Sequence, residues 1–169
     1  KFTVENLLAA EGKEWVPRLQ GGSMVIARLA PQDYHRWHLP VSGRVGKPRA
    51  IAGCLYTVNP IAINHAVNVY TENKRVLIPI ESEQFGFVLL VAIGAIMVGS
   101  IIVEDTDVTK VQPKGALNGY FKFGGSTVLA LFEKNRIAFR DELLINSQMN
   151  IESLIKCGAF LGTAIPQKK

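Results

Sequence analysis

The sequence predicts a mainly β fold of the α+β class, with a few short helices. Many short segments are rich in Val, Ile and aromatic residues, which is typical of strands. Turn-forming residues separate these segments, and the 169 residues include 15 Gly and 8 Pro. Helical patterns are few and short. No segment reads as a linker or a repeat, so a single domain over residues 1–169 is expected.

The expected strands run along most of the chain. In order they are Met24–Ala30, Leu39–Val45, Leu55–Val58, Val67–Tyr70, Arg75–Glu81, Phe87–Ile93, Ala95–Val103, Gly119–Phe123 and Thr127–Phe132. Turn candidates between them are Gly21-Gly22, Gly46–Pro48, Asn59-Pro60, Glu72-Asn73, Pro113–Gly115 and Glu133–Asn135.

Helices are expected in three places. Thr3–Ala10 opens with a threonine suited to cap a helix, followed by an acidic residue and apolar spacing. Pro60–Asn68 is expected to hold a short turn. Asn150–Cys157 places its apolar residues on one helical face, which predicts a short amphipathic helix.

Phe85–Val103 contains no charged residue over 19 positions, which is long enough to span a membrane. Its three glycines and its eight Val or Ile residues argue against a membrane helix. Two buried strands broken near Gly94 fit this composition better.

The charge balance favours an anionic partner. Lys and Arg number 19 against 14 Asp and Glu, giving a net charge of +5. Phospholipid and nucleic acid both suit such an excess. The basic residues are scattered and not interleaved with aromatic residues, so nucleic acid is not expected.

No metal site is expected from the histidines and cysteines. Cys54 and Cys157 lack metal-ligand spacing and are expected to be reduced, buried thiols. His35 and His38 form half of a zinc site at most, and only His65 and the separated cysteines remain as further ligands. The alternative is that His35 and His38 serve two proton-transfer steps, although residues i and i+3 of a regular strand face opposite ways.

The segment Phe123-Gly124-Gly125-Ser126-Thr127 is an unusual setting for a serine. It follows a basic, glycine-spaced run and precedes an apolar strand. This is the pattern of a site where the backbone cuts itself, with a glycine before the serine because it removes crowding and tolerates a strained backbone.

Several motifs together resemble the phosphatidylserine decarboxylases, from about Phe2 to Gly162. The motifs are Leu29 to His38 (LAPQDYHRWH), Tyr56–Pro60, Asn73–Arg75, Gly94–Ser100, Lys114 to Thr127 (KGALNGYFKFGGST) and the tail from Asn146 to Gly158. Each is weak alone, but their order and spacing are specific. The Gly-Gly-Ser-Thr form is similar to the second eukaryotic type and to some bacterial members, whereas Leu-Gly-Ser-Thr is common elsewhere in the family.

The resemblance implies a pyruvoyl cofactor made from Ser126. Ser126 Oγ attacks the carbonyl of Gly125, an ester forms, and β-elimination separates residues 1–125 (the β chain) from residues 126–169 (the α chain). The α chain is left with an N-terminal pyruvoyl group. That group forms a Schiff base with the substrate amine and accepts the electrons released when CO2 departs.

The family pattern also implies roles for other residues. His38 matches the histidine that activates the serine for self-cleavage, and His35 matches the one that assists decarboxylation, by reprotonating the carbanion. Arg36 and Tyr34 are candidate substrate-binding residues. The family's self-cleavage triad further includes an aspartate in an upstream segment that these 169 residues do not contain, and Asp33 does not match it. The chain is therefore expected to lack the N-terminal part of the catalytic domain.

The implied reaction is decarboxylation of phosphatidylserine to phosphatidylethanolamine by a peripheral membrane enzyme. Its partners would be the lipid, an anionic membrane surface and its own two cleaved chains, and a homodimer is left open. Membrane-facing candidates are the amphipathic segment Phe2–Ala10, which includes Leu7 and Leu8, and the side chains of Trp15 and Trp37; ordinary core positions explain these residues equally well.

Two other functions stay open at this point. A related pyruvoyl enzyme that decarboxylates a free amino acid would share the cleaved serine, and a non-catalytic β-rich scaffold would share the fold. For the fold itself, the resemblance implies a biotinyl/lipoyl-like β-hammerhead or barrel arrangement.

Overall fold

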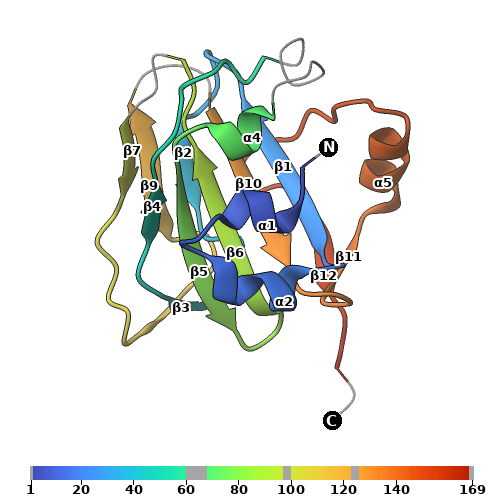
Figure 1. Cartoon of the computed structure of the whole chain (residues 1–169). Coiled ribbons are helices and arrows are strands. Elements are labelled where there is room, and N and C mark those ends of the chain that lie inside the picture. Colours follow the sequence, from blue (N-terminus) through green and yellow to red (C-terminus); the bar gives the residue numbers. More distant parts are fainter. Residues whose placement is uncertain (1, 60–67, 97–99, 123–125, 168–169) are drawn as a thin grey trace.

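The computed structural model describes residues 2–59, 68–96, 100–122 and 126–167. Strands dominate it, and the helices are short (Figure 1), so the prediction of a mainly β fold is confirmed. Gly125 of the expected cleavage site, His65 and the predicted turn at residues 60–67 lie outside the described residues.

The largest sheet is antiparallel and positions the predicted cleavage site. Its strand order is β1-β10-β6-β5-β3-β8, and β4 also pairs with β5. The bounds are β1 Ser23–Leu29, β10 Ser126–Phe132, β6 Gly86–Ile93, β5 Arg75–Ser82, β3 Gly43–Val45, β8 Val111–Gln112 and β4 Arg49–Ile51.

Smaller sheets cover one face of the large sheet. One has the order β2-β9-β7, formed by Arg36–His38, Leu117–Lys122 and Ser100–Val103, and the other pairs β11 Ile137–Phe139 with β12 Gly162–Ala164. Trp37 and Phe121 lie in the core between these layers, with ring centroids 4.8 Å apart. Burying such large rings is a main source of stability for a domain of this size.

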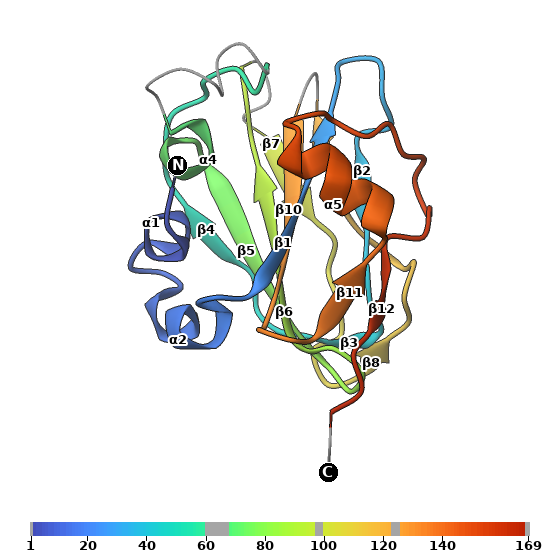
Figure 2. The same ribbon diagram turned by 90° about the vertical axis from the view of Figure 1, so that its right-hand side faces the viewer.

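Short helices cover the other face, as Figure 2 shows for the N-terminal ones. They are α1 Val4–Leu8, a 3-10 turn Lys13–Trp15, α2 Val16–Leu19 and α4 Val69–Glu72. Thr3 caps α1 as predicted, because its Oγ1 accepts a hydrogen bond from the Asn6 N–H at 3.1 Å. Leu7 and Leu8 are fully buried on the sheet and Trp37 is 5% exposed, so these residues are core positions and not membrane contacts.

A buried guanidinium joins two of these helices to the sheet. Arg75 of β5 is 2% exposed and donates to the backbone carbonyls of Asn6, Leu7, Thr71 and Asn73. Burial lowers the pKa of this arginine. The four carbonyls compensate for lost hydration, and the two from α1 lie near its C-terminal end, where a cation is favoured.

The long uncharged run forms strands, as the sequence predicted, but of the two expected buried strands only β6 is buried, because the residues of β7 are exposed or partly exposed. β6 is buried along nearly its whole length between β10 and β5, and β7 follows later in the run. Among the described residues, none of the helices has the length and apolarity to cross a membrane.

Four predictions of local structure were wrong at least in part. Val69 and Tyr70, expected in a strand Val67–Tyr70, lie in helix α4. Leu55–Val58 lies outside any strand, the strand expected over Leu39–Val45 forms only at Gly43–Val45, and Asn150–Cys157 is irregular. A helix instead precedes that last segment, as α5 Asp141–Gln148. Its two acidic residues at the start suit the helix dipole, and the left-handed φ of +57° at Asn150 ends the helical path. The cysteines also differ from expectation, because both are exposed.

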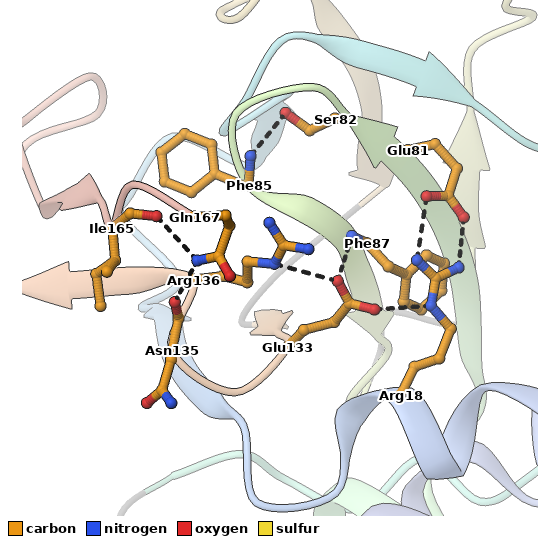
Figure 3. Close-up of polar contacts among 10 residues, drawn as sticks. All are labelled: Arg18, Glu81, Ser82, Phe85, Phe87, Glu133, Asn135, Arg136, Ile165 and Gln167. Atoms are coloured by element: carbon orange, nitrogen blue, oxygen red, sulfur yellow. Dashed lines mark hydrogen bonds and ion pairs between the residues drawn. The ribbon is translucent and has the colours of Figure 1, made fainter. Parts of the chain in front are cut away.

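A polar network holds the end of the large sheet that is remote from Ser126 (Figure 3). Arg18 donates to both carboxylate oxygens of Glu81, at 2.6 and 3.2 Å, and to Glu133 at 2.7 Å. Glu133 also accepts the N–H of Phe87 at 3.0 Å and pairs with Arg136. Glu133 follows the last residue of β10, so this network fixes that strand at its far end.

Candidate active site around Ser126

Ser126 is the first residue of β10, and its position follows from the strand's register. It pairs with Leu29 of β1, while the next residue, Thr127, pairs with both Arg28 and Ile93. Val128, Ala130 and Phe132 face the core under the smaller sheets. Because side chains alternate along a strand, Ser126 faces the same side, and it is fully buried there.

His35 is the side chain that the structure brings to Ser126. Its Nδ1 lies 3.3 Å from Ser126 Oγ, and its Nε2 lies 3.2 Å from the carbonyl oxygen of Pro31. A carbonyl only accepts, so the Pro31 contact places the ring proton on Nε2. Nδ1 of the neutral ring is then free to accept a hydrogen bond from the serine hydroxyl.

Local backbone contacts hold His35 in this place. Asp33 closes a tight turn after Ala30, with Oδ2 accepting the Ala30 N–H at 2.7 Å and its own N–H donating to the Ala30 carbonyl at 2.9 Å. The Pro31 carbonyl projects from this turn. On the other side, the N–H of Phe121 in β9 donates to the His35 carbonyl at 2.9 Å. The motif thus bends as it enters β2, and the bend directs His35 inward.

His38 faces away from Ser126, on the outer side of β2. Its Nε2 lies 2.8 Å from the Tyr34 hydroxyl and its Nδ1 lies 2.9 Å from the Gly115 carbonyl oxygen. The Tyr34 and His38 rings stack, with an angle of 11° between their planes. The alternation expected for a strand therefore separates the two histidines, and no contact among the described residues joins His38 to Ser126.

Comparison with known proteins identifies the family of this chain. A sequence model of the family described as phosphatidylserine decarboxylase matches residues 1–162. The chain belongs to the phosphatidylserine decarboxylase family. It is 50% identical to phosphatidylserine decarboxylase proenzyme 3 of Schizosaccharomyces pombe, over 100% of this chain and 17% of that protein.

Two other relatives show the same pattern of coverage. Identity is 52% to phosphatidylserine decarboxylase proenzyme 2 of Oryza sativa subsp. japonica, over 97% of this chain and 26% of that protein. Identity is 44% to the phosphatidylserine decarboxylase proenzyme of Chlamydia muridarum, over 95% of this chain and 52% of that protein. The chain thus spans between about a sixth and about a half of the length of these relatives.

In this member of the phosphatidylserine decarboxylase family, Arg36 and Tyr34 lie on the outer face of β2 with His38. The Arg36 guanidinium lies over the Tyr120 ring, 5.0 Å from its centroid. Arg36 is exposed, and no carboxylate contacts it among the described residues. Tyr34 is half exposed. Both side chains are accessible to an anionic ligand, but neither contacts Ser126.

Sequence reasoning missed one ion pair beside the site. Arg28 of β1 binds both carboxylate oxygens of Glu152, at 2.9 and 2.6 Å, and so attaches the segment after α5 to the strand next to Ser126. The hydrogen bonds from Arg28 lower the pKa of Glu152. Burial, with a smaller contribution from Glu152, raises the pKa of nearby Tyr70 to about 12. The partners are 124 residues apart, so no local pattern signals this contact.

The polar features that remain near Ser126 are the hydroxyl of Thr127 and any side chains that could bind a metal ion. Thr127 is fully buried, and its hydroxyl has no hydrogen-bond partner among the described residues. In the same described part of the chain, no three His, Cys, Asp or Glu residues come together as a metal site. Among the described residues, the polar side chain that contacts Ser126 is therefore His35.

Proposed function

We propose that the protein cleaves itself between Gly125 and Ser126 and then decarboxylates phosphatidylserine to phosphatidylethanolamine. One observation carries this proposal: in a phosphatidylserine decarboxylase family chain, the hydroxyl of Ser126 is buried at the start of β10 and lies 3.3 Å from a histidine nitrogen. Burial excludes water, which would otherwise compete as a nucleophile, and the histidine lies where it can exchange a proton with a group formed at this position.

The proposed cleavage transfers the Gly125 acyl group from nitrogen to oxygen. Ser126 Oγ forms the new bond to the Gly125 carbonyl carbon, the amide C–N bond breaks, and the serine proton ends on the released amine. A base then removes the Cα proton of Ser126 while the Cβ–Oγ bond breaks, which frees the Gly125 carboxylate and leaves a Cα–Cβ double bond. The resulting enamine becomes an imine, and addition of one water releases ammonia and leaves a carbonyl at the first position of β10.

The residues around Ser126 fit a pyruvoyl group at this position. The group is no larger than the serine it replaces, and His35 Nδ1 already lies beside the site. When present, a pyruvoyl carbonyl supplies an electrophile for a primary amine and accepts electrons as CO2 leaves. His35 is then placed to return a proton to the substrate, once Nδ1 has itself taken up a proton from solvent, and this is the role that the family pattern implies.

His38 is proposed to act in the cleavage step, again by the family pattern. Its support in this structure is indirect, because the contact to Ser126 Oγ is made by His35. The two assignments predict different phenotypes for His35→Ala and His38→Ala.

The lipid substrate and a peripheral membrane location are part of the same proposal. The net charge of +5 attracts an anionic surface, and the exposed Arg36 on the outer face of β2 carries no carboxylate partner in the described structure. An enzyme that acts on a free amino acid would also use Ser126, so the substrate has to be tested directly.

The proposal is tested by denaturing electrophoresis and intact mass of the full-length protein. Wild type is expected to split before Ser126, and the smaller piece should have a blocked, borohydride-reducible N-terminus. Ser126→Ala should remain whole. An uncleaved wild type that still decarboxylates would refute the pyruvoyl mechanism. Activity on phosphatidylserine vesicles, compared with a panel of free amino acids, separates the two substrate classes, and a protein that neither cleaves nor turns over either substrate would be a scaffold.

A further inference from the structure

We propose that Asn73 is a positioning residue for substrate binding, because its buried amide holds residues 54–59 at the end of the large sheet that carries Ser126. The effect on the substrate rests on the proposed function, whereas the contacts of the amide do not. Two sequence motifs that the chemistry at Ser126 leaves unused, one around Tyr56 and one around Asn73, meet in these contacts.

The Asn73 side chain is fully buried, and both ends of its amide are used. Its Oδ1 accepts the Tyr56 N–H at 2.9 Å, and its Nδ2 donates to the Tyr56 carbonyl at 2.7 Å and to the Gly94 carbonyl at 2.8 Å. The two carbonyls can only accept, so they fix which end of the amide carries the nitrogen. The side chain thus replaces a neighbouring strand for Tyr56 and joins that residue to Gly94.

Backbone contacts press the same segment against the residues on either side of Asn73. The Cys54 N–H donates to the Glu72 carbonyl, and the Lys74 N–H donates to the Cys54 carbonyl, both at 2.8 Å. Gly53 permits this close approach, since a Cβ at that position would lie 2.3 Å from the Glu72 carbonyl oxygen. The segment therefore has a fixed position although it forms no regular strand.

The register of the large sheet places these contacts beside Ser126. Thr127 pairs with Ile93, so Gly94, the next residue after β6, lies at the level of Ser126. Neighbouring strands lie about 5 Å apart, and Tyr56 is joined to Gly94 through a single side chain. A lipid head group whose amine lies at position 126 can therefore reach this segment.

The segment presents side chains to solvent at this end of the sheet. Leu55 is 37% exposed and Tyr56 is 45% exposed, although the backbone of Tyr56 is held by Asn73. Val58 is buried instead, in a small separate apolar cluster. An exposed aliphatic chain and an exposed phenol on a rigid backbone can contact a lipid head group and the glycerol next to it. Loss of the Asn73 amide is therefore expected to weaken substrate binding and to leave the serine itself undisturbed.

The first test measures the contact directly, by hydrogen exchange of the Tyr56 amide. Full-length Ser126→Ala protein, which stays whole in any case, is compared with the same protein carrying Asn73→Ala. Loss of the acceptor should speed exchange of the Tyr56 N–H at least about tenfold. Leu19→Ala is the control, because it removes a buried side chain at the opposite end of the sheet and should have no selective effect on Tyr56. Equal protection of Tyr56 with and without the Asn73 amide would overturn the inference.

The second test measures the consequence for catalysis in full-length protein with Ser126 intact. Asn73→Ala should cleave within about twofold of the wild-type rate and should raise the KM for phosphatidylserine in mixed micelles about five- to tenfold, with a smaller change in kcat. Gly53→Ala, which displaces the same segment by a different route, should repeat this pattern, whereas Leu19→Ala should not.

Tyr56→Ala keeps the test decisive if the buried variants fold poorly. It removes a half-exposed side chain, leaves the backbone contacts of the segment in place and should also raise the KM about fivefold. An unchanged KM in Tyr56→Ala would overturn the role of the segment in substrate binding. If wild type itself failed to cleave, the proposed function would fall, while hydrogen exchange would still test the contact between Asn73 and Tyr56.

Discussion

At the scale of single residues, the main finding is that two histidines three positions apart have separate surroundings. His35 lies against Ser126 and the Pro31 carbonyl, whereas His38 lies between Tyr34 and Gly115. Each ring has a carbonyl on one nitrogen and a hydroxyl on the other. A histidine with a carbonyl on one ring nitrogen and a hydroxyl on the other therefore lies on each side of β2. His35, just before the strand, faces the buried serine, and His38 faces the outer surface.

The histidine variants separate the two proposed roles. We expect His35→Ala to cleave at Ser126 but to lose decarboxylation, because the side chain beside the reacting position is gone. His38→Ala should fail to cleave. Both are measured in full-length protein by electrophoresis, followed by CO2 release from phosphatidylserine vesicles. Loss of cleavage in His35→Ala with normal cleavage in His38→Ala would show that the contact to Ser126 Oγ is that of the cleavage base, and the two roles would be exchanged.

Thr127 offers a test of its unpartnered hydroxyl. Thr127→Val replaces the buried hydroxyl by a methyl group of similar size, so the free energy of unfolding should rise by about 1 kcal/mol. Urea denaturation of the uncleaved Ser126→Ala background measures this change. Ser147→Ala, at an exposed position of α5, is a control that should change stability by less than about 0.5 kcal/mol. A loss of stability in Thr127→Val would mean that the hydroxyl has a partner in the folded protein.

At the scale of elements, long patterned segments were predicted well and short ones poorly. The strands β1, β5, β6 and β10 agree with their predicted ranges within one residue at each end. Strands such as β4 and β8 were missed, since two or three residues carry too little periodicity to be recognised and exist only because a neighbouring strand pairs with them. The contact between His35 and Ser126 depends on β2 and β10 meeting across 91 residues, which local pattern does not encode.

The burial of α1 gives a prediction at this scale. Leu8 is fully buried against the large sheet, so Leu8→Ala should lower the free energy of unfolding by about 2–5 kcal/mol. Leu144→Ala is the matched control, because Leu144 of α5 is 44% exposed and its truncation should cost little. Both are compared by urea denaturation. If the two losses were equal and small, α1 would not contribute to the core of the folded protein.

At the scale of the whole molecule, the proposed cut at residue 125 divides the fold unevenly. β10, in the smaller piece, lies between β1 and β6, which belong to the larger piece. Two ion pairs also join the pieces, Arg18 with Glu133 and Arg28 with Glu152. The smaller piece is thus held by two strand ladders and by contacts near both ends of β10.

These ion pairs predict how acid affects the cleaved protein. Burial works to raise the pKa of Glu133, but the Phe87 N–H and Arg18 outweigh it, and the pKa falls below its ordinary value of 4.5. The pKa of Glu152 is lowered too, chiefly by Arg28. Groups with a lowered folded pKa stabilise the fold above the unfolded value and lose that effect as the pH falls. The midpoint of urea-induced separation should therefore fall as the pH drops below about 4.5, in parallel with protonation of these glutamates.

The control for this prediction is Glu133→Gln. This substitution removes the titrating carboxylate of the ion pair between Arg18 of the larger piece and Glu133 of the smaller piece. Its urea midpoint should be lower than that of wild type at pH 7 and should change less between pH 7 and pH 3.5. A wild-type midpoint that is the same at both pH values would show that the ion pairs between the pieces do not contribute to their association.

The position of β10 between β1 and β6 affects how the protein could refold after the proposed cleavage. Before cleavage, folding is a unimolecular event, and β10 is delivered to its place by the covalent chain. After cleavage, unfolding releases two separate polypeptides, so the stability of the mature form depends on its concentration. Refolding would then require an encounter between a larger piece whose sheet lacks β10 and a smaller piece that carries β10, helix α5 and the paired strands β11 and β12. If the protein cleaves itself as proposed, it therefore has to fold first and mature second, and a mature molecule that unfolds in dilute solution is not expected to recover.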